Sequence, residues 1–319
     1  MTEAVILAIA AFLDFLIGDP RRLFHPVQAI GWGITQYTRW TLKHFDSDRS
    51  QFWAGVGLTV SAIGLSGFAG WAIVWLASQV HSIAGIALST VLLASCFAGR
   101  SLKDAAIDVL EPLESGDLET ARSRLAKYVG RDTKGLSQPE ILRAVLETVT
   151  ENAIDGVLAP LFWAIVGAFT PLGSIPIALA YKAASTLDSM VGYRDAPYTF
   201  LGRFSARLED GLTWIPCRLG AGSIALLSGR PFQVWQICRR DAPQDPSPNA
   251  GWSEAAYAAA LGVQVGGKNT YRGVVKFKPL LGDAIAPIAP QTIHQATRLT
   301  RICFLMWLAI ALPFLYLRS

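Results

Sequence analysis

The stretch ETVTENAIDGVLAPLFW, residues 147–163, sets acidic side chains directly against an apolar run. Glu147, Glu151 and Asp155 stand four residues apart, so a helix would align them on one face at steps of roughly 6 Å. Aligned carboxylates repel one another unless a cation lies between them. Their oxygens suit a hard cation such as Mg²⁺ bound together with substrate phosphates. The spacing therefore predicts a divalent-cation site at these three acids, with Asn152 as a neutral cofactor contact.

Two other interpretations of the acids stay open. Glu147 and Glu151 could belong to an exposed helical face on which they pair with Arg143. Acids at a membrane boundary could also form a relay for protons or ions.

Two further segments carry side chains suited to phosphate chemistry. In YKAASTLDSMVGYRD, residues 181–195, Lys182 and Arg194 could hold phosphate or carboxylate oxygens, with Asp188 nearby; they could equally be basic surface residues. In VGRDT, Arg131 and Asp132 precede the acidic helix as either a turn or a substrate clamp. Residues 262–269, GVQVGGKN, resemble a phosphate loop, but they follow a helical pattern where that motif needs a strand, so no such loop is expected.

Membrane helices must position these groups. The chain has 319 residues, 52% of them hydrophobic and 16% charged, whereas soluble domains carry about 25% charged residues. This composition predicts an all-α, polytopic integral membrane protein with about four to six transmembrane or re-entrant helices and cytoplasmic helical loops. The apolar segments are residues 4–17, 53–77, 83–98, 157–181, 212–227 and 302–317. The fourth and fifth are weak because proline, glycine or arginine interrupts them.

The polar segments indicate organisation and sidedness. We expect a single membrane-embedded domain over residues 1–319, with an amphipathic cytoplasmic helical region at 99–156 and a polar, turn-rich loop region at 228–301. Lys and Arg in the loops 18–52 and 99–156 place those loops in the cytoplasm. The four widely spaced cysteines are expected to be buried thiols. No basic tract indicates nucleic acid as a partner.

Several motifs together resemble the CobD/CbiB family of membrane-bound adenosylcobinamide-phosphate synthases. They are GDPRRLFHPVQAIG, VGRDT, ETVTENAIDGVLAPLFW, YKAASTLDSMVGYR, GRFSARLEDGLTWIPCRL and SPNAGWSEAAYAAALGVQVGGKNTYRG, in that order up to about residue 282. The resemblance implies an enzyme of the inner membrane that condenses adenosylcobyric acid, a corrinoid, with (R)-1-amino-2-propanol O-2-phosphate or a related amino alcohol, using ATP and Mg²⁺. The lipid bilayer and other membrane-associated cobalamin-assembly enzymes are the partners implied.

Such a ligase needs a metal to bridge phosphates, cations to absorb developing charge and a neutral amine. We therefore expect Glu147, Glu151 and Asp155 to hold Mg-ATP on the cytoplasmic side, and the cations Lys182, Arg194 and Arg131 to neutralise phosphates. Asp188 or Asp132 would be a second metal ligand or the base. Substrate contacts are expected at His25, Asp19, Asn249, Ser253 and Glu254. A transporter, or a regulatory membrane protein like the related AmpE branch, remains as an alternative, although the VGRDT and YKAASTLDSMVGYR segments favour the synthase.

Overall fold

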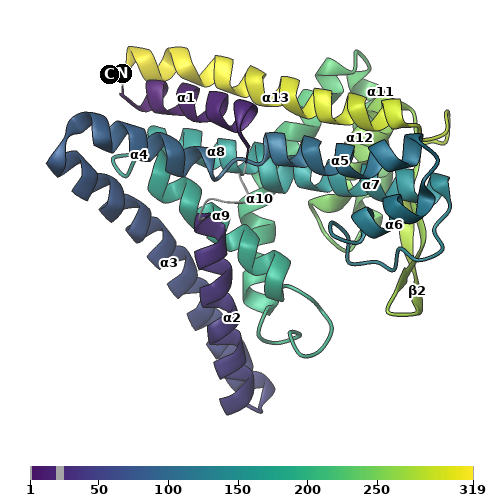
Figure 1. Cartoon of the computed structure of the whole chain (residues 1–319), viewed down its shortest axis with the longest axis horizontal. Helices are drawn as coiled ribbons and strands as arrows, with labels where there is room; N and C mark the ends of the chain where they lie inside the picture. The colour runs from purple at the N-terminus through teal and green to yellow at the C-terminus, as the bar shows by residue number, and fades with distance from the viewer. Residues whose placement is uncertain (1, 19–24, 319) are drawn as a thin grey trace. The chain divides into compact units, whose positions relative to one another are not determined.

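The protein is an all-α, polytopic membrane protein, as the composition predicts. A computed structural model describes residues 2–18 and 25–318, and nearly all of its regular elements are helices (Figure 1). Within these residues, four helical segments are long and apolar enough to cross a membrane: Asp48–Val80, Ser82–Glu114, Gln138–Ala168 and Pro290–Leu317.

The chain divides into two compact units. Unit 1 contains Met1–Ala98, Ala159–Thr213 and Trp307–Ser319, and unit 2 contains Gly99–Leu158 and Trp214–Met306. Two long helices, α10 (Arg203–Leu227) and α13 (Pro290–Leu317), contribute residues to both units.

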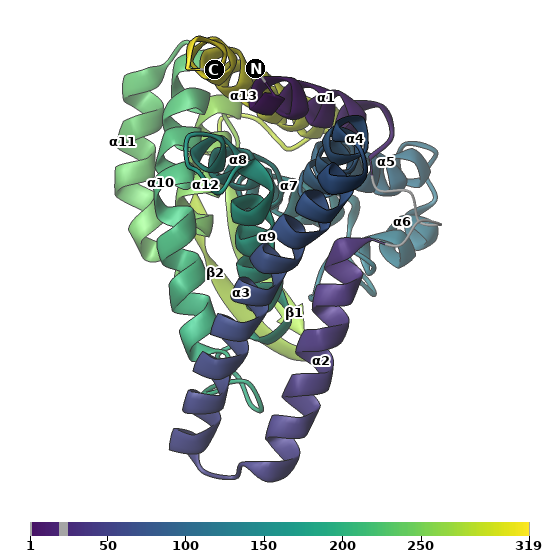
Figure 2. The same ribbon diagram turned by 90° about the vertical axis from the view of Figure 1, so that its left-hand side faces the viewer.

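Unit 1 is built from apolar helices. They are α1 (Thr2–Leu16), α2 (Pro26–His44), α3 (Asp48–Val80), α4 (Ser82–Ala94), α8 (Ala159–Ala168) and α9 (Ser174–Val191). Helices α2 and α3 follow one another as a hairpin, and α9 packs against both (Figure 2). Leu58, Leu187 and Val191 form a buried cluster with Ile34. At Gly70 an added Cβ would lie 2.4 Å from Leu179 Cδ1, so the glycine permits the close approach of α3 and α9.

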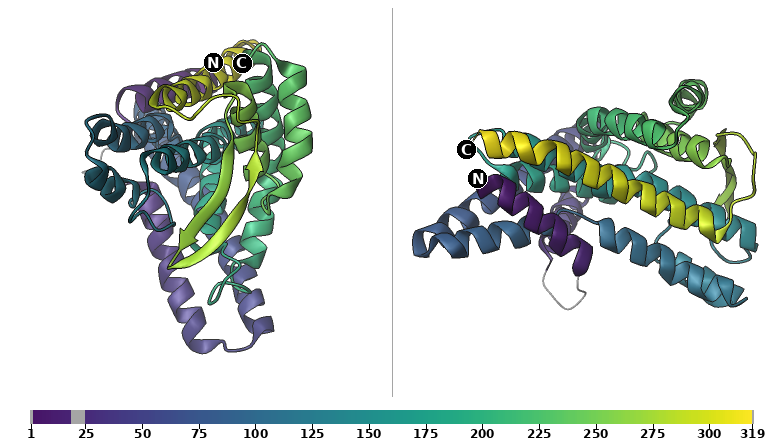
Figure 3. Two further views of the ribbon diagram at one scale, coloured as in Figure 1. Left: turned by 90° about the vertical axis from the view of Figure 1, so that its right-hand side faces the viewer. Right: turned by 90° about the horizontal axis from the view of Figure 1, so that it is seen from above.

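Unit 2 combines shorter helices with one β-hairpin. Its elements include α5 (Gly99–Glu114), α6 (Leu118–Leu125), α7 (Gln138–Asn152), the π-helix η1 (Ala153–Leu158), α11 (Pro231–Asp241), the 3-10 helix η2 (Ala242–Gln244) and α12 (Ala250–Leu261). Strands β1 (Val265–Tyr271) and β2 (Val274–Leu281) pair antiparallel (Figure 3). Both α7 and α12 pack against β1.

Local sequence explains where α7 and the hairpin begin and turn. The Ser137 amide donates to Glu140 Oε2 at 2.7 Å, which is half of a capping box at the start of α7. The hairpin turns at Arg272 and Gly273, whose φ angles are 51° and 80°. Positive φ at both central residues is the requirement of a tight two-residue turn that matches the strand twist.

The predicted helices are present, together with other elements that the sequence pattern did not indicate. The interruption expected within residues 157–181 is real, since α8 ends at Ala168 and α9 begins at Ser174. Pro216, by contrast, does not break α10. The sequence pattern missed α2 within the loop 18–52, and it missed α11 and the hairpin within 228–301. All four cysteines are free and buried, as predicted.

Candidate functional site

Glu147 lies at the centre of a buried ion-pair network in unit 2. Its side chain is 2% exposed, and Arg131 Nη2 donates to its Oε2 atom. The Gly266 amide donates to Oε1 at 2.8 Å, and Arg143 Nη1 lies 3.8 Å from the same oxygen. Both carboxylate oxygens are therefore engaged by the protein itself. This arrangement differs from an exposed helical face, although Arg143 is the partner that the exposed-face interpretation named.

The same arginines connect α7 to the first strand of the hairpin. Asn269 Oδ1 accepts from Arg131 Nη1 at 2.8 Å and from Arg143 Nη2 at 3.1 Å. Arg143 also donates to the carbonyls of Gly266 and Lys268. Gly266 has φ 95°, and an added Cβ would lie 1.9 Å from Pro279 O, so only glycine fits there. The GGKN segment is thus one strand of a pinned hairpin, and no helix follows it as a phosphate loop would require.

Asp132 fixes the turn of the hairpin. Its Oδ1 atom accepts from the Arg272 amide at 3.1 Å, and its Oδ2 atom accepts from the Gly273 amide at 2.8 Å. The Asp132 amide in turn donates to Thr270 O at 2.8 Å. Both oxygens of this carboxylate satisfy turn amides, so the structure gives Asp132 a positioning role. Its predicted role as a base or metal ligand stays a prediction.

A second group of charges surrounds Lys278 on β2, and we call it the Lys278 cluster: Lys278, Glu254, Asp245 and Glu151. Lys278 Nζ donates to Glu254 Oε1 and lies 4.0 Å from Asp245 Oδ2. Glu254 is fully buried, and its Oε2 atom has no hydrogen-bond partner among the described residues; the same is true of Asp245 Oδ2. Both oxygens are therefore available to a further donor or cation.

The pKa values in this cluster report an excess of negative charge. Burial raises the pKa of Glu254 to about 8; Glu151 and Glu147 add to this effect, and Lys278 opposes it. Burial alone would lower the pKa of Lys278, but the carboxylates of Glu254, Glu151 and Glu147 outweigh it and raise that pKa. Positive charge is therefore held strongly here.

The last turn of α7 presents Glu151 differently from Glu147. Glu151 and Asn152 are exposed, and Asn152 Nδ2 donates to Thr148 O at 2.9 Å. The π-helical segment η1 begins at Ala153 and carries Asp155. A π-helix is wider than an α-helix, so the spacing of four residues no longer keeps Asp155 in line with Glu147 and Glu151.

The oxygen donors fit a magnesium ion that is held partly by its substrate. Carboxylates are the ligands Mg²⁺ prefers, and the oxygens of Glu254 and Asp245 that accept no hydrogen bond add to Glu151. Across residues 2–18 and 25–318, however, no three or more His, Cys, Asp or Glu side chains are grouped closely enough to hold an ion alone. Mg²⁺ commonly takes one or two carboxylates and completes its shell with phosphates and water. Convergence of Glu147, Glu151 and Asp155 on one ion stays a prediction.

The predicted substrate contacts on and beside α12 are buried. Asn249, Ser253 and Glu254 are 4%, 1% and 0% exposed. Asn249 Oδ1 accepts from Arg218 Nη1 at 2.6 Å, and Ser253 Oγ donates to Thr150 O on α7. These contacts hold α12 in place, and direct contact with a substrate stays a prediction.

The other predicted site residues belong to unit 1. His25 Nδ1 accepts from the Val27 amide at 3.2 Å and caps the N-terminus of α2, while Asp19 lies outside the described residues. Lys182 and Asp188 lie on α9, and Arg194 is exposed in the loop that follows. Their predicted roles stay predictions.

Unit 1 also contains a buried acid that spacing did not reveal. Thr213 Oγ1 donates to Glu209 Oε1 and lies 2.9 Å from the Tyr181 hydroxyl. Burial raises the pKa of Glu209 to about 7, and the charges of Asp188 and Asp210 contribute, while the Thr213 hydrogen bond opposes the rise.

In unit 2, sequence reasoning missed Lys278, Asp245 and the pairing role of Asn269. Asn269 was visible as the asparagine two positions after the glycine pair Gly266-Gly267. Lys278 carried no local signal, because its importance depends on strand pairing and on residues more than twenty positions away.

Comparisons with known proteins agree with these motifs. The family model described as "CobD/Cbib protein" matches residues 7–300. A "Cobalamin biosynthesis protein CobD" of Synechocystis sp. is 52% identical over 313 residues, which cover 98% of this chain and 92% of the relative. The protein of that name in Geobacter metallireducens is 44% identical (94% and 93% covered), and "Cobalamin biosynthesis protein CbiB" of Salmonella typhimurium is 40% identical (95% and 93%). No solved structure matches the chain. With a family match over most of its length and near full-length relatives, the chain belongs to the CobD/CbiB family.

Proposed function

We propose that this protein acts in cobalamin biosynthesis as a membrane-bound ligase that forms an amide. Its substrates would be adenosylcobyric acid, (R)-1-amino-2-propanol O-2-phosphate or a related amino alcohol, and ATP. The product would be adenosylcobinamide phosphate. The enzyme would lie in the cytoplasmic membrane with its site open to the cytoplasm, where these charged metabolites are found and where the Lys- and Arg-rich loops are expected.

The reaction divides into two balanced steps. A carboxylate oxygen of the corrinoid attacks the γ-phosphorus of ATP, the bond from that phosphorus to ADP breaks, and an acyl phosphate forms. The amine nitrogen then attacks the acyl carbon, the bond to phosphate breaks, and the nitrogen loses a proton as the amide forms. When bound, Mg²⁺ would offset the negative charge of the phosphates.

Residues of unit 2 can bind and orient these groups. Glu151 would hold the metal ion, together with the oxygens of Glu254 and Asp245 that accept no hydrogen bond. Lys278, whose side chain is 22% exposed, would offer an ammonium group to phosphate oxygens. The network of Arg131, Arg143 and Glu147 would keep α7 and the hairpin in register. The predicted phosphate contacts Lys182 and Arg194 and the predicted base Asp188 belong to unit 1 and remain part of the hypothesis.

The observation that carries the proposal is the Lys278 cluster in a chain that belongs to this family. An exposed carboxylate stands beside two buried carboxylates that each keep an oxygen without a hydrogen bond. Buried polar atoms are normally satisfied. A bound cation with its phosphates would satisfy them.

The test uses the full chain purified in detergent with adenosylcobyric acid, aminopropanol phosphate and Mg-ATP. Mass spectrometry should detect adenosylcobinamide phosphate, with one ATP consumed for each amide formed. Glu151→Gln should abolish most turnover, whereas Glu114→Gln, an exposed acid at the end of α5, should not. Product without ATP consumption would refute the acyl-phosphate steps, and absence of product with every amino alcohol tried would refute the proposed activity.

A further inference from the structure

Unit 1 contains a large cavity that the proposed reaction does not use. It has a volume of about 820 Å³ and lies between α1, α2, α3, α4 and one residue of α9. We call it the α2–α3 groove. Ligand sites typically have volumes of about 300–1,000 Å³, so the groove is large enough to hold a ligand.

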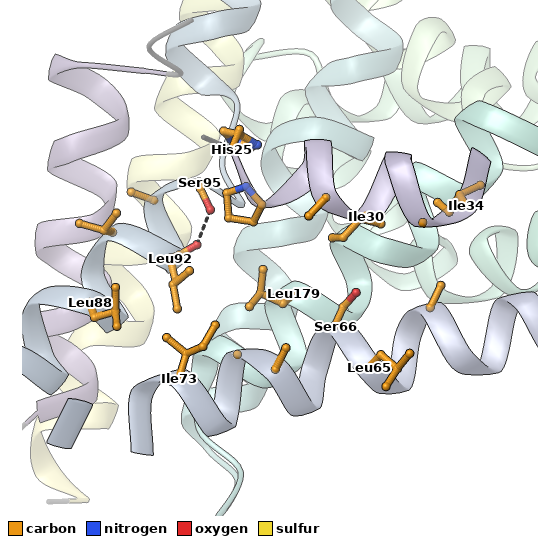
Figure 4. Close-up of a pocket in the computed structure, with 18 of the residues that line it drawn as sticks. His25, Ile30, Ile34, Leu65, Ser66, Ile73, Leu88, Leu92, Ser95 and Leu179 are labelled. Carbon is orange, nitrogen blue, oxygen red and sulfur yellow. Dashed lines mark hydrogen bonds between the residues drawn. The ribbon is translucent and has the colours of Figure 1, made fainter. Parts of the chain in front are cut away.

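The lining of the groove is almost entirely apolar. Figure 4 shows Ile30 and Ile34 from α2 facing Leu65 and Ile73 from α3, with Leu92 of α4 beside them. Small residues make the hollow, because Gly33 lines it and an added Cβ there would meet no atom within 4 Å. A corrinoid with its many amide groups, or a nucleotide with its phosphates, would lose hydrogen bonds to water here without replacing them.

The groove lies where lipid is the surrounding solvent. Both α3 and the segment that begins with α4 qualify as membrane spans. The outer faces of these helices carry exposed apolar side chains such as Phe68, Leu76 and Ile83. A hollow between such helices is filled by hydrocarbon more readily than by water, because its few polar atoms cannot satisfy water molecules.

The length of the groove matches one lipid chain. It follows α2 from His25 to Tyr37, twelve residues or roughly 18 Å of helix. One leaflet of a bilayer supplies about half of a hydrocarbon core that is roughly 30 Å thick. His25 and Ser95 lie near one another, where the start of α2 approaches the end of α4 (Figure 4). They are among the few polar side chains that line the groove.

We propose that the α2–α3 groove binds one acyl chain of a membrane phospholipid. The chain fills the space between α2 and α3 and gives α2 an apolar surface to pack against. This binding does not depend on the reaction proposed for unit 2.

The test uses the full chain reconstituted in nanodiscs with a phospholipid that carries a photoreactive diazirine in one acyl chain. After irradiation, peptide mapping compares label on groove residues with label on Ile310, an exposed apolar residue of α13. Gly33→Phe fills the groove from α2 and should lower groove labelling by roughly fivefold or more while leaving Ile310 labelling unchanged, because the packed ring excludes the chain. Gly64→Phe on α3 is the matched control, since its Cβ also meets open space but Gly64 does not line the groove.

Ala69→Phe fills the groove from the α3 side and serves if Gly33→Phe does not fold, as judged by gel filtration and circular dichroism. Selective loss of groove label in either filling variant supports the proposal. Equal loss in Gly64→Phe, or groove labelling that neither filling variant changes, overturns it. Crosslinks from groove residues to a second polypeptide in place of lipid would also overturn it, because a protein segment would then be the occupant.

Discussion

Glu147→Gln is expected to destabilise the fold rather than to weaken the affinity for Mg²⁺. One oxygen of the Glu147 carboxylate accepts from Arg131 and the other from the Gly266 amide. A glutamine amide has a single oxygen, so either orientation points an NH₂ group at one of these donors. Arg131, whose side chain is 9% exposed, then remains as a buried cation without its counter-ion.

The expected loss of unfolding free energy depends on the contacts that Arg131 retains. Removing one partner of a buried ion pair costs about 3–5 kcal/mol. Arg131 retains its hydrogen bond to Asn269, so we expect the lower end, about 3 kcal/mol of unfolding free energy. Arg131→Gln should lose a similar amount. The double variant should lose less than the sum by roughly 1–3 kcal/mol, because neither side then leaves an unpaired charge.

The assay is denaturant unfolding of the detergent-solubilised variants followed by circular dichroism, with activity measured at rising Mg²⁺. Glu114→Gln controls for the loss of an exposed acid. The reasoning is refuted if Glu147→Gln unfolds like the wild type but recovers activity as Mg²⁺ is raised. Glu147 would then be a metal ligand, as the spacing alone predicted, and its contact with Arg131 would be replaced when substrate binds.

Four further predictions follow from the same contacts. Glu151→Gln should remove most activity at saturating Mg²⁺ without lowering stability, because the side chain is exposed; near-normal turnover would make Glu151 an ordinary surface acid. Lys268→Ala should leave nucleotide binding unchanged, because Arg143 contacts only the backbone carbonyl of that residue, and lost binding would revive the phosphate loop. Burial raises the Glu209 pKa from 4.5 to about 7. The stabilisation from protonated Glu209 is therefore complete below pH 4.5, and about 3 kcal/mol of unfolding free energy is lost as pH rises through 7. The unfolding free energy of Glu209→Gln should depend less on pH, and an unchanged slope would contradict this. In a background with the native buried cysteines replaced, Lys134→Cys should resist impermeant thiol reagents in intact cells and react after permeabilisation. Lys134 is chosen because it is exposed, whereas the neighbouring Thr133 is buried. Labelling of Lys134→Cys in intact cells would place the site outside the cytoplasm.

Much of the helical fold could be predicted from the sequence, because membrane helices appear there as long apolar runs. The missed helix α2 is only moderately apolar, yet its signals were present: His25 as a cap, Pro26 at the first position, and Ile30 and Ile34 four residues apart. The missed hairpin also had a signal, since Arg-Gly lies between two runs that contain valine and aromatic residues. Both were hidden within segments that composition classified as loops.

The candidate site was harder to read because its pairings are distant in sequence. The four-residue spacing correctly located a helix that carries Glu147 and Glu151. It could not show that Arg131 and Gly266, 16 and 119 positions away from Glu147, already occupy that carboxylate. Nor could it place Lys278 beside Glu254, because that contact depends on how the hairpin packs against α12.

The repulsion between the aligned acids is therefore relieved in a different way at each position. A buried carboxylate needs a partner from its own chain, because an unpaired buried charge destabilises the fold whenever no ligand is bound. Glu147 is such a group, and arginine from its own chain neutralises it. The Glu151 side chain is exposed, so a cation can reach it. The four-residue spacing does not distinguish the two acids. Their burial does, because buried Glu147 stabilises the fold of the site whereas exposed Glu151 can bind and release a ligand. For that reason stability should respond to Glu147 and catalysis to Glu151, and a pair of variants that reversed this order would show that the substrate-bound site is organised differently from the fold described above.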